Sequence, residues 1–193
     1  YHAPYYSFGI TPCCWSKVFK KELLEQCLYP VTPKVKIGED AAFTYPCLLA
    51  AESLAYVDGC LYHYRNNAQS MTAAFDPHLT ETIFIPLDIL RTYFDTDKRA
   101  LFAQYQMYAA YLLQLWVRNQ ASLDCDLDRK RMRQSCARVC QNQELRALLA
   151  SVPGALPRQV AVAVRAVQQQ KPGQLYLLIK AWNLYYKLRN GRA

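Results

Sequence analysis

Segments with apolar residues at helical spacing fill this chain from residue 78 to residue 189. A helix with one apolar face has to pack that face against another element. The spacing predicts helices near residues 78–94, 98–121, 127–140, 143–151, 157–170 and 173–189. We therefore expect an all-helical region over residues 75–193.

One of these helices carries no formal charge from Ala100 to Val117. A stretch of this length has to be considered as a membrane-spanning helix. It contains three glutamines and three tyrosines, however, which favour a buried helix in a protein core. We expect a core helix here.

The first 74 residues have a different character. The pattern predicts a helix over residues 17–26, and Gly38-Glu39-Asp40 opens a second helix. Residues 54–57 and 60–65 are short β-prone runs on either side of Asp58-Gly59, a dipeptide typical of hairpin turns. The predicted fold class is therefore α/β to mostly α, with short helices and a β-hairpin preceding the helical region.

Composition and cysteine usage are typical of a globular protein from a reducing compartment. Hydrophobic residues make up 52% of the chain and charged residues 20%, which excludes a disordered or low-complexity sequence. The eight cysteines include no C-x-x-C pair, and several lie in apolar segments. We expect a cytoplasmic protein. The chain begins at Tyr1 without a methionine or a signal region, so we also expect it to belong to a longer protein.

The positive charge of the chain is concentrated in its last third. Residues 1–125 hold 10 Lys and Arg against 12 Asp and Glu, whereas residues 126–193 hold 13 against 3. This asymmetry indicates an acidic partner for the C-terminal region, either an anionic membrane or a nucleic acid. A solvated helical face is the simpler alternative. We find no motif typical of a nucleic-acid reader, so we expect no nucleic-acid partner.

The acidic pair Glu39-Asp40 is the first candidate for chemistry, because it follows a glycine at a predicted helix start. Acidic residues are favoured in any first helical turn, where they complement the helix dipole, so position alone does not indicate a catalytic role.

The neighbours of this pair, taken in order, are more specific. They are Trp15-Ser16-Lys17-Val18-Phe19-Lys20-Lys21, Gly38-Glu39-Asp40-Ala41-Ala42-Phe43, Val57-Asp58-Gly59-Cys60-Leu61-Tyr62-His63-Tyr64-Arg65 and Ser70-Met71-Thr72. This order resembles the second half of bacterial family 2 glycosyltransferases of the GT-A fold, over about residues 12–72. The resemblance implies that residues 1–74 are the acceptor-side remainder of a catalytic domain.

The resemblance also implies an inverting sugar transfer from a nucleotide-sugar to a sugar or lipid-linked acceptor, in cell-surface polysaccharide synthesis. Asp40 would be the general base that takes the proton from the acceptor hydroxyl, and Glu39 would orient the acceptor or the helix start. Lys17 and Arg65 would lie near the diphosphate or the acceptor, although either could instead pair with Glu39. Trp15 would stack on a sugar or fill a core.

A GT-A enzyme also needs a D-x-D motif that holds Mg²⁺ or Mn²⁺ against the diphosphate. The two D-x-D strings here, at residues 95–97 and 124–126, follow Asp40 and lie between predicted helices, which favours helix capping. We predict no metal site or other cofactor in this chain. The metal and most of the donor site are expected in an upstream nucleotide-binding part, without which the chain would be inactive.

The last predicted helix is amphipathic. Its apolar face carries Leu175, Leu178, Ile179, Trp182 and Tyr186, and the opposite stripe carries Lys180, Asn183 and Lys187. The pattern fits an interfacial helix on the inner face of the cell membrane, with Trp182, Lys180 and Lys187 at the interface, and it fits packing onto its own domain equally well. The alternative to an enzyme fragment is a non-catalytic helical module that binds a partner or an anionic membrane through this basic third.

Overall fold

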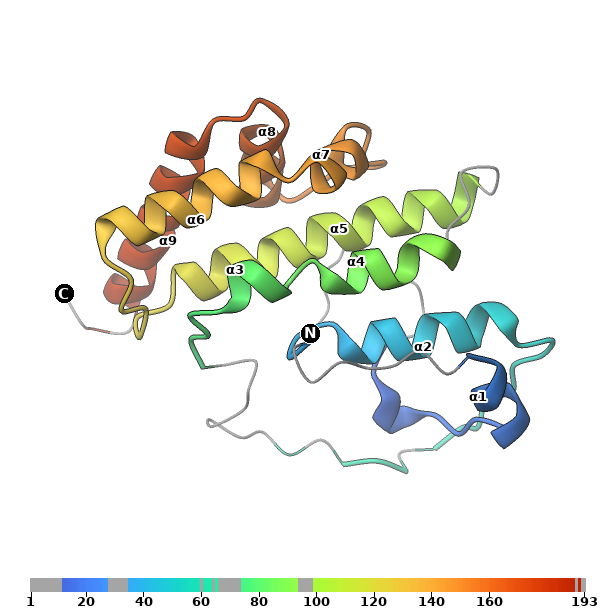
Figure 1. Ribbon diagram of the computed structural model, residues 1–193. Helices are drawn as coiled ribbons and strands as arrows, with labels where there is room; N and C mark the ends of the chain where they lie inside the picture. The colour runs from blue at the N-terminus through green and yellow to red at the C-terminus, as the bar shows by residue number, and fades with distance from the viewer. Residues whose placement is uncertain are drawn as a thin grey trace.

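The computed structural model describes residues 12–27, 35–59, 61–63, 65, 74–93, 99–189 and 191 of the chain. Its described part is all-helical (Figure 1). The helices are η1 (Cys14–Ser16), α1 (Lys21–Cys27), α2 (Glu39–Ala50), α3 (Leu79–Thr82), α4 (Ile85–Leu90), η2 (Arg91–Tyr93), α5 (Arg99–Gln120), α6 (Arg129–Gln141), α7 (Gln143–Leu149), α8 (Arg158–Gln168) and α9 (Pro172–Arg189).

The C-terminal helices form a bundle around α5, the longest of the described helices (Figure 1). Side chains of α5 such as Leu112, Leu113 and Trp116 are fully buried, and the indole nitrogen of Trp116 donates a hydrogen bond to Thr80 of α3 at 3.0 Å. Helices α6, α8 and α9 close the other side of the bundle, with α9 packed between its two neighbours. The predicted helices from residue 98 onward are confirmed, and α5 is a core helix. The single helix predicted near residues 78–94 is divided into α3, α4 and η2 in the described residues.

Among the described residues, no helix is both long and apolar enough to cross a membrane. The charge-free stretch of α5 instead buries polar groups with partners. The amide of Gln106 donates to the carbonyl oxygen of Leu148 and to the Ser151 hydroxyl, each at 3.0 Å. A buried amide that is satisfied by neighbouring helices is typical of a protein core.

Helix α2 packs on α4, which lies between α2 and α5 in Figure 1. Ala41 of α2 belongs to the same buried cluster as the side chains of the C-terminal bundle, and Ile37 and Tyr45 pack against it. One continuous core therefore runs through the position near residue 74 at which we drew the boundary between two regions. Helix α1 contacts α2 on the outside of this core.

The predicted β-hairpin is wrong for the residues that the structure describes. Residues 54–59, 61–63 and 65 contain no strand, and Cys60 and Tyr64 lie outside the described residues. The turn explains part of the failure. A type I′ turn needs positive φ at both central residues, but only Gly59 has it, at 137°. In addition, an isolated two-stranded hairpin is marginal without a third strand or a helix on its face.

The side chains of this segment confirm that nothing covers it among the described residues. Leu54, Tyr56, Val57 and Leu61 are between 61% and 89% exposed. The fold is thus all-helical in its described part, and the prediction of a GT-A piece with a β-hairpin is corrected on this point.

Candidate functional site

Gly38 fixes the place where α2 begins. Its φ of 92° lies in the left-handed region, and a Cβ atom at this position would lie 2.7 Å from the Tyr108 hydroxyl and 2.9 Å from Cγ of Pro86. Only glycine fits such a backbone this close to two neighbouring side chains. The first turn of α2 is therefore held against α5 and α4 at a defined position.

Glu39 and Asp40 occupy that first turn and are both half-buried. Burial is the main cause that raises the pKa of the Glu39 carboxyl, and the charge of Asp40 raises it further. The backbone N–H of Glu39 opposes this shift. The pair is thus two adjacent carboxyls, and the partly buried Glu39 binds its proton more tightly than a free glutamate does.

A buried tyrosine lies beneath these carboxyls. Burial raises the pKa of Tyr108 well above its ordinary value, and the charges of Tyr45, Tyr111, Glu39 and Asp40 act in the same direction. The ring of Tyr45 meets that of Tyr108 edge to face, with centroids 6.0 Å apart. Tyr108 is therefore a neutral phenol, and its buried ring supports the first turn of α2.

Cys14 connects the η1 turn to the same place. Its sulfur lies 3.6 Å from the Thr44 hydroxyl and 4.0 Å from the carbonyl oxygen of Asp40. Burial, followed by the neighbouring Asp40 side chain, raises the pKa of the Cys14 thiol to about 11. Cys14 is consequently a protonated thiol at neutral pH. Because only a thiolate is a good nucleophile, we assign Cys14 the structural role of anchoring η1 on α2.

The structure brings Lys17 to this edge of the molecule but does not pair it with Glu39. The Lys17 ammonium donates to the carbonyl oxygen of Cys13 at 2.8 Å and to the Ser16 hydroxyl at 3.3 Å. Its charge also lowers the pKa of the Cys14 thiol slightly, against the larger effects of burial and Asp40. Lys17 therefore holds the η1 turn together, and its charge acts on the Cys14 thiol that contacts α2.

Trp15 stacks on Tyr62, with ring centroids 4.7 Å apart and an interplanar angle of 21°. Trp15 is 45% exposed and Tyr62 is 50% exposed, so the stacked pair forms an open aromatic surface rather than part of the core. Arg65 is also exposed, and it forms no ion pair with another described residue. The serine-containing motif at residues 70–72 lies outside the described residues.

The part of the chain that the structure describes offers no group of three or more His, Cys, Asp or Glu side chains that could hold a metal ion. The D-x-D string at residues 95–97 lies outside that part. The other string is in the loop before α6, where the Ser122 hydroxyl accepts a hydrogen bond from the backbone of Asp124, and the following Asp128 caps α6. The described residues do not fit the Mg²⁺ or Mn²⁺ of a GT-A enzyme, so no step below involves a metal.

The face of α9 that carries Trp182 packs against the core of the protein. Leu175 and Ile179 on that face are fully buried, and Trp182 is half-buried with Tyr186 beside it at 6.2 Å between ring centroids. Lys180 and Lys187 are exposed. The face we predicted to bind a membrane is therefore occupied by the protein itself in its buried part.

Three residues of this site have no counterpart in the sequence prediction, namely Cys14, Tyr62 and Tyr108. Tyr62 lies inside the motif at residues 57–65 and Cys14 directly precedes the one at residues 15–21, but nothing in their spacing indicates which side chains they contact. No protein-family model, curated protein or solved structure matches this chain.

Proposed function

We propose that residues 12–72 form the acceptor side of a glycosyltransferase, with Asp40 as the general base. The observation that carries the proposal is the rigid placement of a half-buried acidic pair at the start of α2, which the η1 turn contacts through Cys14. The motif residue Trp15 is part of this turn, and Lys17 holds the turn together. A general base has to be aimed at one position, and the packing of Gly38 on Tyr108 provides that rigidity.

In the proposed reaction, a carboxylate oxygen of Asp40 accepts the proton of an acceptor hydroxyl. The oxygen so activated forms a bond to the anomeric carbon of the nucleotide-sugar, and the bond to the nucleoside diphosphate breaks with inversion. The leaving diphosphate takes the electron pair of that bond. Glu39 orients the acceptor, the stacked Trp15 and Tyr62 offer an apolar face to a sugar ring, and Lys17 and Arg65 supply positive charge.

The donor site is not part of this proposal for the described residues, which contain no phosphate-binding loop after a strand. The nucleotide-sugar and its metal belong to an upstream part of the protein. We propose a cytoplasmic protein at the inner face of the cell membrane, with a sugar or lipid-linked acceptor, acting in cell-surface polysaccharide synthesis. Buried free thiols such as Cys27, Cys47 and Cys136 are consistent with a reducing compartment.

Asp40→Asn in the intact cellular protein tests the role of the base. The amide keeps the shape of the side chain but cannot accept the proton, so we expect sugar transfer to fall about 10²- to 10⁴-fold. Binding of the nucleotide-sugar, measured by calorimetry, should change little. Asp58→Asn is the matched control, because it removes an exposed carboxylate from the same region.

Equal turnover of the two variants would remove Asp40 from the mechanism. A loss of transfer together with loss of nucleotide-sugar binding would point to a structural role instead. The melting temperature of each variant has to be compared, since a carboxylate in a first helical turn stabilises a helix by about 0.3–1 kcal/mol.

The alternative function is a helical module that binds through its basic C-terminal third. A specific observation favours binding by this part of the chain, namely an exposed apolar stripe on α9 that adjoins a basic groove. Such a surface is compatible with the enzyme function.

A further inference from the structure

Helix α9 has an outer apolar stripe as well as an inner one. Its inner face buries Leu175 and Ile179, whereas Leu177, Leu184 and Leu188 are 66%, 57% and 63% exposed. These three leucines follow one another at intervals of seven and four residues, so they lie along one face of the helix. We call Leu177, Leu184 and Leu188 the outer leucine stripe. No described residue covers it.

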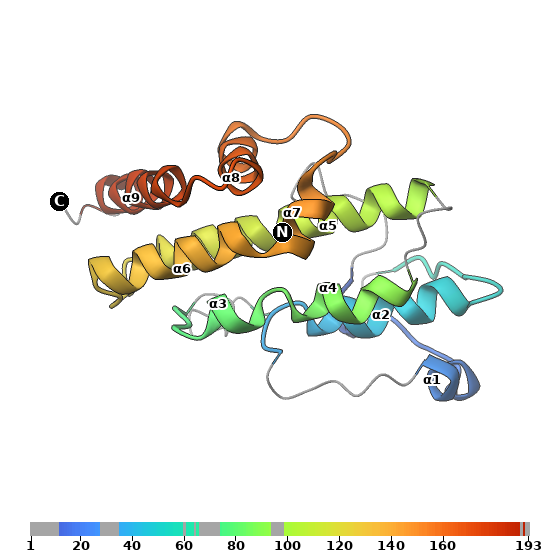
Figure 2. The same cartoon turned by 45° about the horizontal axis from the view of Figure 1, so that its top comes forward.

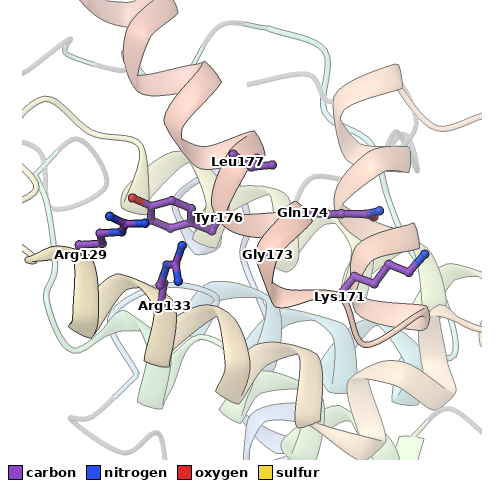
Figure 3. A pocket seen from close by; sticks show the side chains of 7 residues that line it. All are labelled: Arg129, Arg133, Lys171, Gly173, Gln174, Tyr176 and Leu177. Carbon is purple, nitrogen blue, oxygen red and sulfur yellow. The ribbon is translucent and has the colours of Figure 1, made fainter.

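A basic groove adjoins the N-terminal end of this stripe (Figure 3). It has a volume of about 570 Å³ and includes Leu177 itself. The groove is lined by Arg129, Arg133, Lys171, Gly173, Gln174, Tyr176 and Leu177. In Figure 3, Arg129 and Arg133 rise from α6 towards Tyr176, while Lys171 extends away at the other end.

The positive charges of this groove and of the adjoining part of α9 are not paired with carboxylates among the described residues. Arg129, Arg133, Lys171, Lys180 and Lys187 form no ion pair with any described carboxylate. Instead, the guanidinium of Arg133 lies 5.3 Å from the centroid of the Tyr176 ring, and the Lys180 ammonium lies 5.7 Å from it. These contacts hold two cations beside the stripe without reducing their charge.

The few acidic groups in this part of the chain leave the surface basic. Asp128 accepts a hydrogen bond from the backbone of Arg131 at the start of α6, and Glu144 lies 3.7 Å from the guanidinium of Arg91. Asp126 is exposed before α6, close enough to Lys180 for both charges to act on the thiol of Cys125. Asp124, Asp126 and Asp128 are all exposed before α6, so three carboxylates stand against five cations and the surface stays basic.

We propose that this surface of α6 and α9 binds an anionic lipid bilayer. The leucines of the outer stripe enter the boundary between headgroups and acyl chains, and the cations of the groove bind lipid phosphate groups. The outer helix face combines apolar side chains with unpaired cations. An anionic bilayer is complementary to it, because its apolar interior lies just below a layer of phosphate groups. This surface is distinct from the face of Trp182, and its role does not depend on the proposed sugar transfer.

Two other occupants match the surface less well. A nucleic acid would use the cations, but it would leave three exposed leucines without a partner, and none of them can stack on a base. A second copy of the chain could cover the leucines, but a symmetric contact would bring the cations of both copies together. A bilayer satisfies the apolar and the charged part at once.

The test is co-sedimentation of the chain with vesicles of phosphatidylcholine alone and with vesicles that contain one quarter phosphatidylglycerol. We expect binding to the anionic vesicles and much weaker binding to the neutral ones. Arg129→Gln with Arg133→Gln should weaken binding about 25-fold, because each basic side chain near the surface contributes about a factor of five. Lys20→Gln with Lys21→Gln, at the start of α1 and at the other end of the molecule in Figure 1, is the control of equal charge and should bind normally.

Leu184→Gln with Leu188→Gln tests the apolar part. Both side chains are exposed, so the folded structure should be kept, while binding should fall about tenfold or more because less apolar surface enters the bilayer. Leu54→Gln with Leu61→Gln replaces two exposed leucines far from α9 and should bind normally. The circular dichroism and melting temperature of every variant establish that it is folded.

Three results would overturn the proposal. The first is no preference for anionic vesicles, and the second is equal binding by the α9 variants and their controls. The third is tighter binding to a duplex or single-stranded oligonucleotide than to the vesicles, dependent on Arg129 and Arg133 but not on the leucines. Since the assay needs neither a donor sugar nor Asp40, its failure would leave the proposed glycosyltransferase untouched, and the reverse also holds.

Discussion

The region around α2 and the bundle of α5 to α9 bury their apolar side chains to very different degrees. In the bundle, large apolar residues such as Leu145, Leu149 and Trp116 have no exposed surface. Between α2 and α3, by contrast, Leu54, Tyr56 and Leu61 are mostly exposed on an extended chain. The two regions share one core, but the bundle is packed more closely than the region around α2. Figure 2 shows α2 and α4 on one side of α5, and α8 and α9 on the opposite side.

The difference shows that the motifs of the candidate site and the stability of the fold come from separate parts of the chain. The motif residues Asp40, Trp15 and Lys17 are positioned by a few contacts to α5 and within the η1 turn. The bundle is stabilised by helix packing that involves none of these three residues. Substitutions in the two regions should therefore affect stability very unequally.

The largest expected effect tests this comparison with two tryptophans. Trp116→Ala leaves a cavity in the bundle core and the Thr80 hydroxyl without its partner, so we expect a loss of about 3–5 kcal/mol of unfolding free energy. Trp15→Ala removes an exposed stack on Tyr62 and should cost about 1 kcal/mol or less. Urea unfolding followed by circular dichroism measures both. Similar losses would contradict the unequal distribution of stability.

The second effect concerns Gly38, a point at which the start of α2 meets the core. Gly38→Ala places a Cβ atom 2.7 Å from the Tyr108 hydroxyl on a backbone with φ of 92°. We expect a loss of about 1–3 kcal/mol, because both the contact and the backbone conformation become strained. Gly173→Ala on α9 is the control, since no heavy atom lies within 4 Å of its added Cβ.

In the control, alanine in a helix should raise stability by about 0.4–1 kcal/mol. Equal and small effects of the two substitutions would show that the start of α2 is not held by the core. The close contact of Gly38 with Tyr108 and Pro86 would then not fix the position of the acidic pair.

The sequence predicts these regions with unequal success for physical reasons. The helices of the bundle follow from the 3.6-residue spacing, which acts locally and which packing reinforces, so α5 to α9 are confirmed. The start of α2 follows from Gly38 and the two acidic residues. The hairpin at residues 54–65 is wrong because strand pairing is not local and Asp58 lacks the positive φ that the expected turn needs.

The candidate site is predicted only in part. The acidic pair is found at a helix start, but its contacts with Cys14 and Tyr108 join residues far apart in the sequence. Neither Lys17 nor Arg65 forms an ion pair with Glu39 among the described residues. Sequence spacing could not decide this, because long, flexible side chains can reach several different partners. The amphipathic pattern of α9 correctly indicates an apolar face, but it cannot show that Leu175 and Ile179 pack inward while three further leucines remain outside.

Helix caps provide a third and smaller contrast between the regions. Asn142 ends α6 and caps α7, and its side-chain oxygen accepts a hydrogen bond from the backbone of Leu145 at 2.9 Å. Helix α2 begins at Gly38 without a side-chain cap. Asn142→Ala should cost about 1 kcal/mol of unfolding free energy, because the N–H of Leu145 loses its acceptor.

Gln143→Ala changes an exposed neighbour and should alter the unfolding free energy by less than about 0.5 kcal/mol. Hydrogen exchange at Leu145 measures the effect locally. An unchanged exchange rate in Asn142→Ala would mean that packing alone fixes the start of α7. The side-chain cap of Asn142 would then contribute nothing to the stability of the bundle.

The smallest expected effect is a pH dependence that belongs to the site alone. The folded protein raises the pKa of Glu39, mainly through burial, so it binds the Glu39 proton more tightly than the unfolded chain does. The contribution of this group to stability is therefore greatest at acidic pH and is lost as the pH rises through the carboxyl range. Glu39→Gln removes that loss and should make the protein relatively more stable at neutral than at acidic pH, compared with the parent. Glu52→Gln, on exposed chain after α2, controls for net charge. If both variants shift the pH profile of the melting temperature equally, the start of α2 is as solvated as the segment that follows it. The acidic pair would then lack the buried environment that the proposed role of Asp40 as a general base requires.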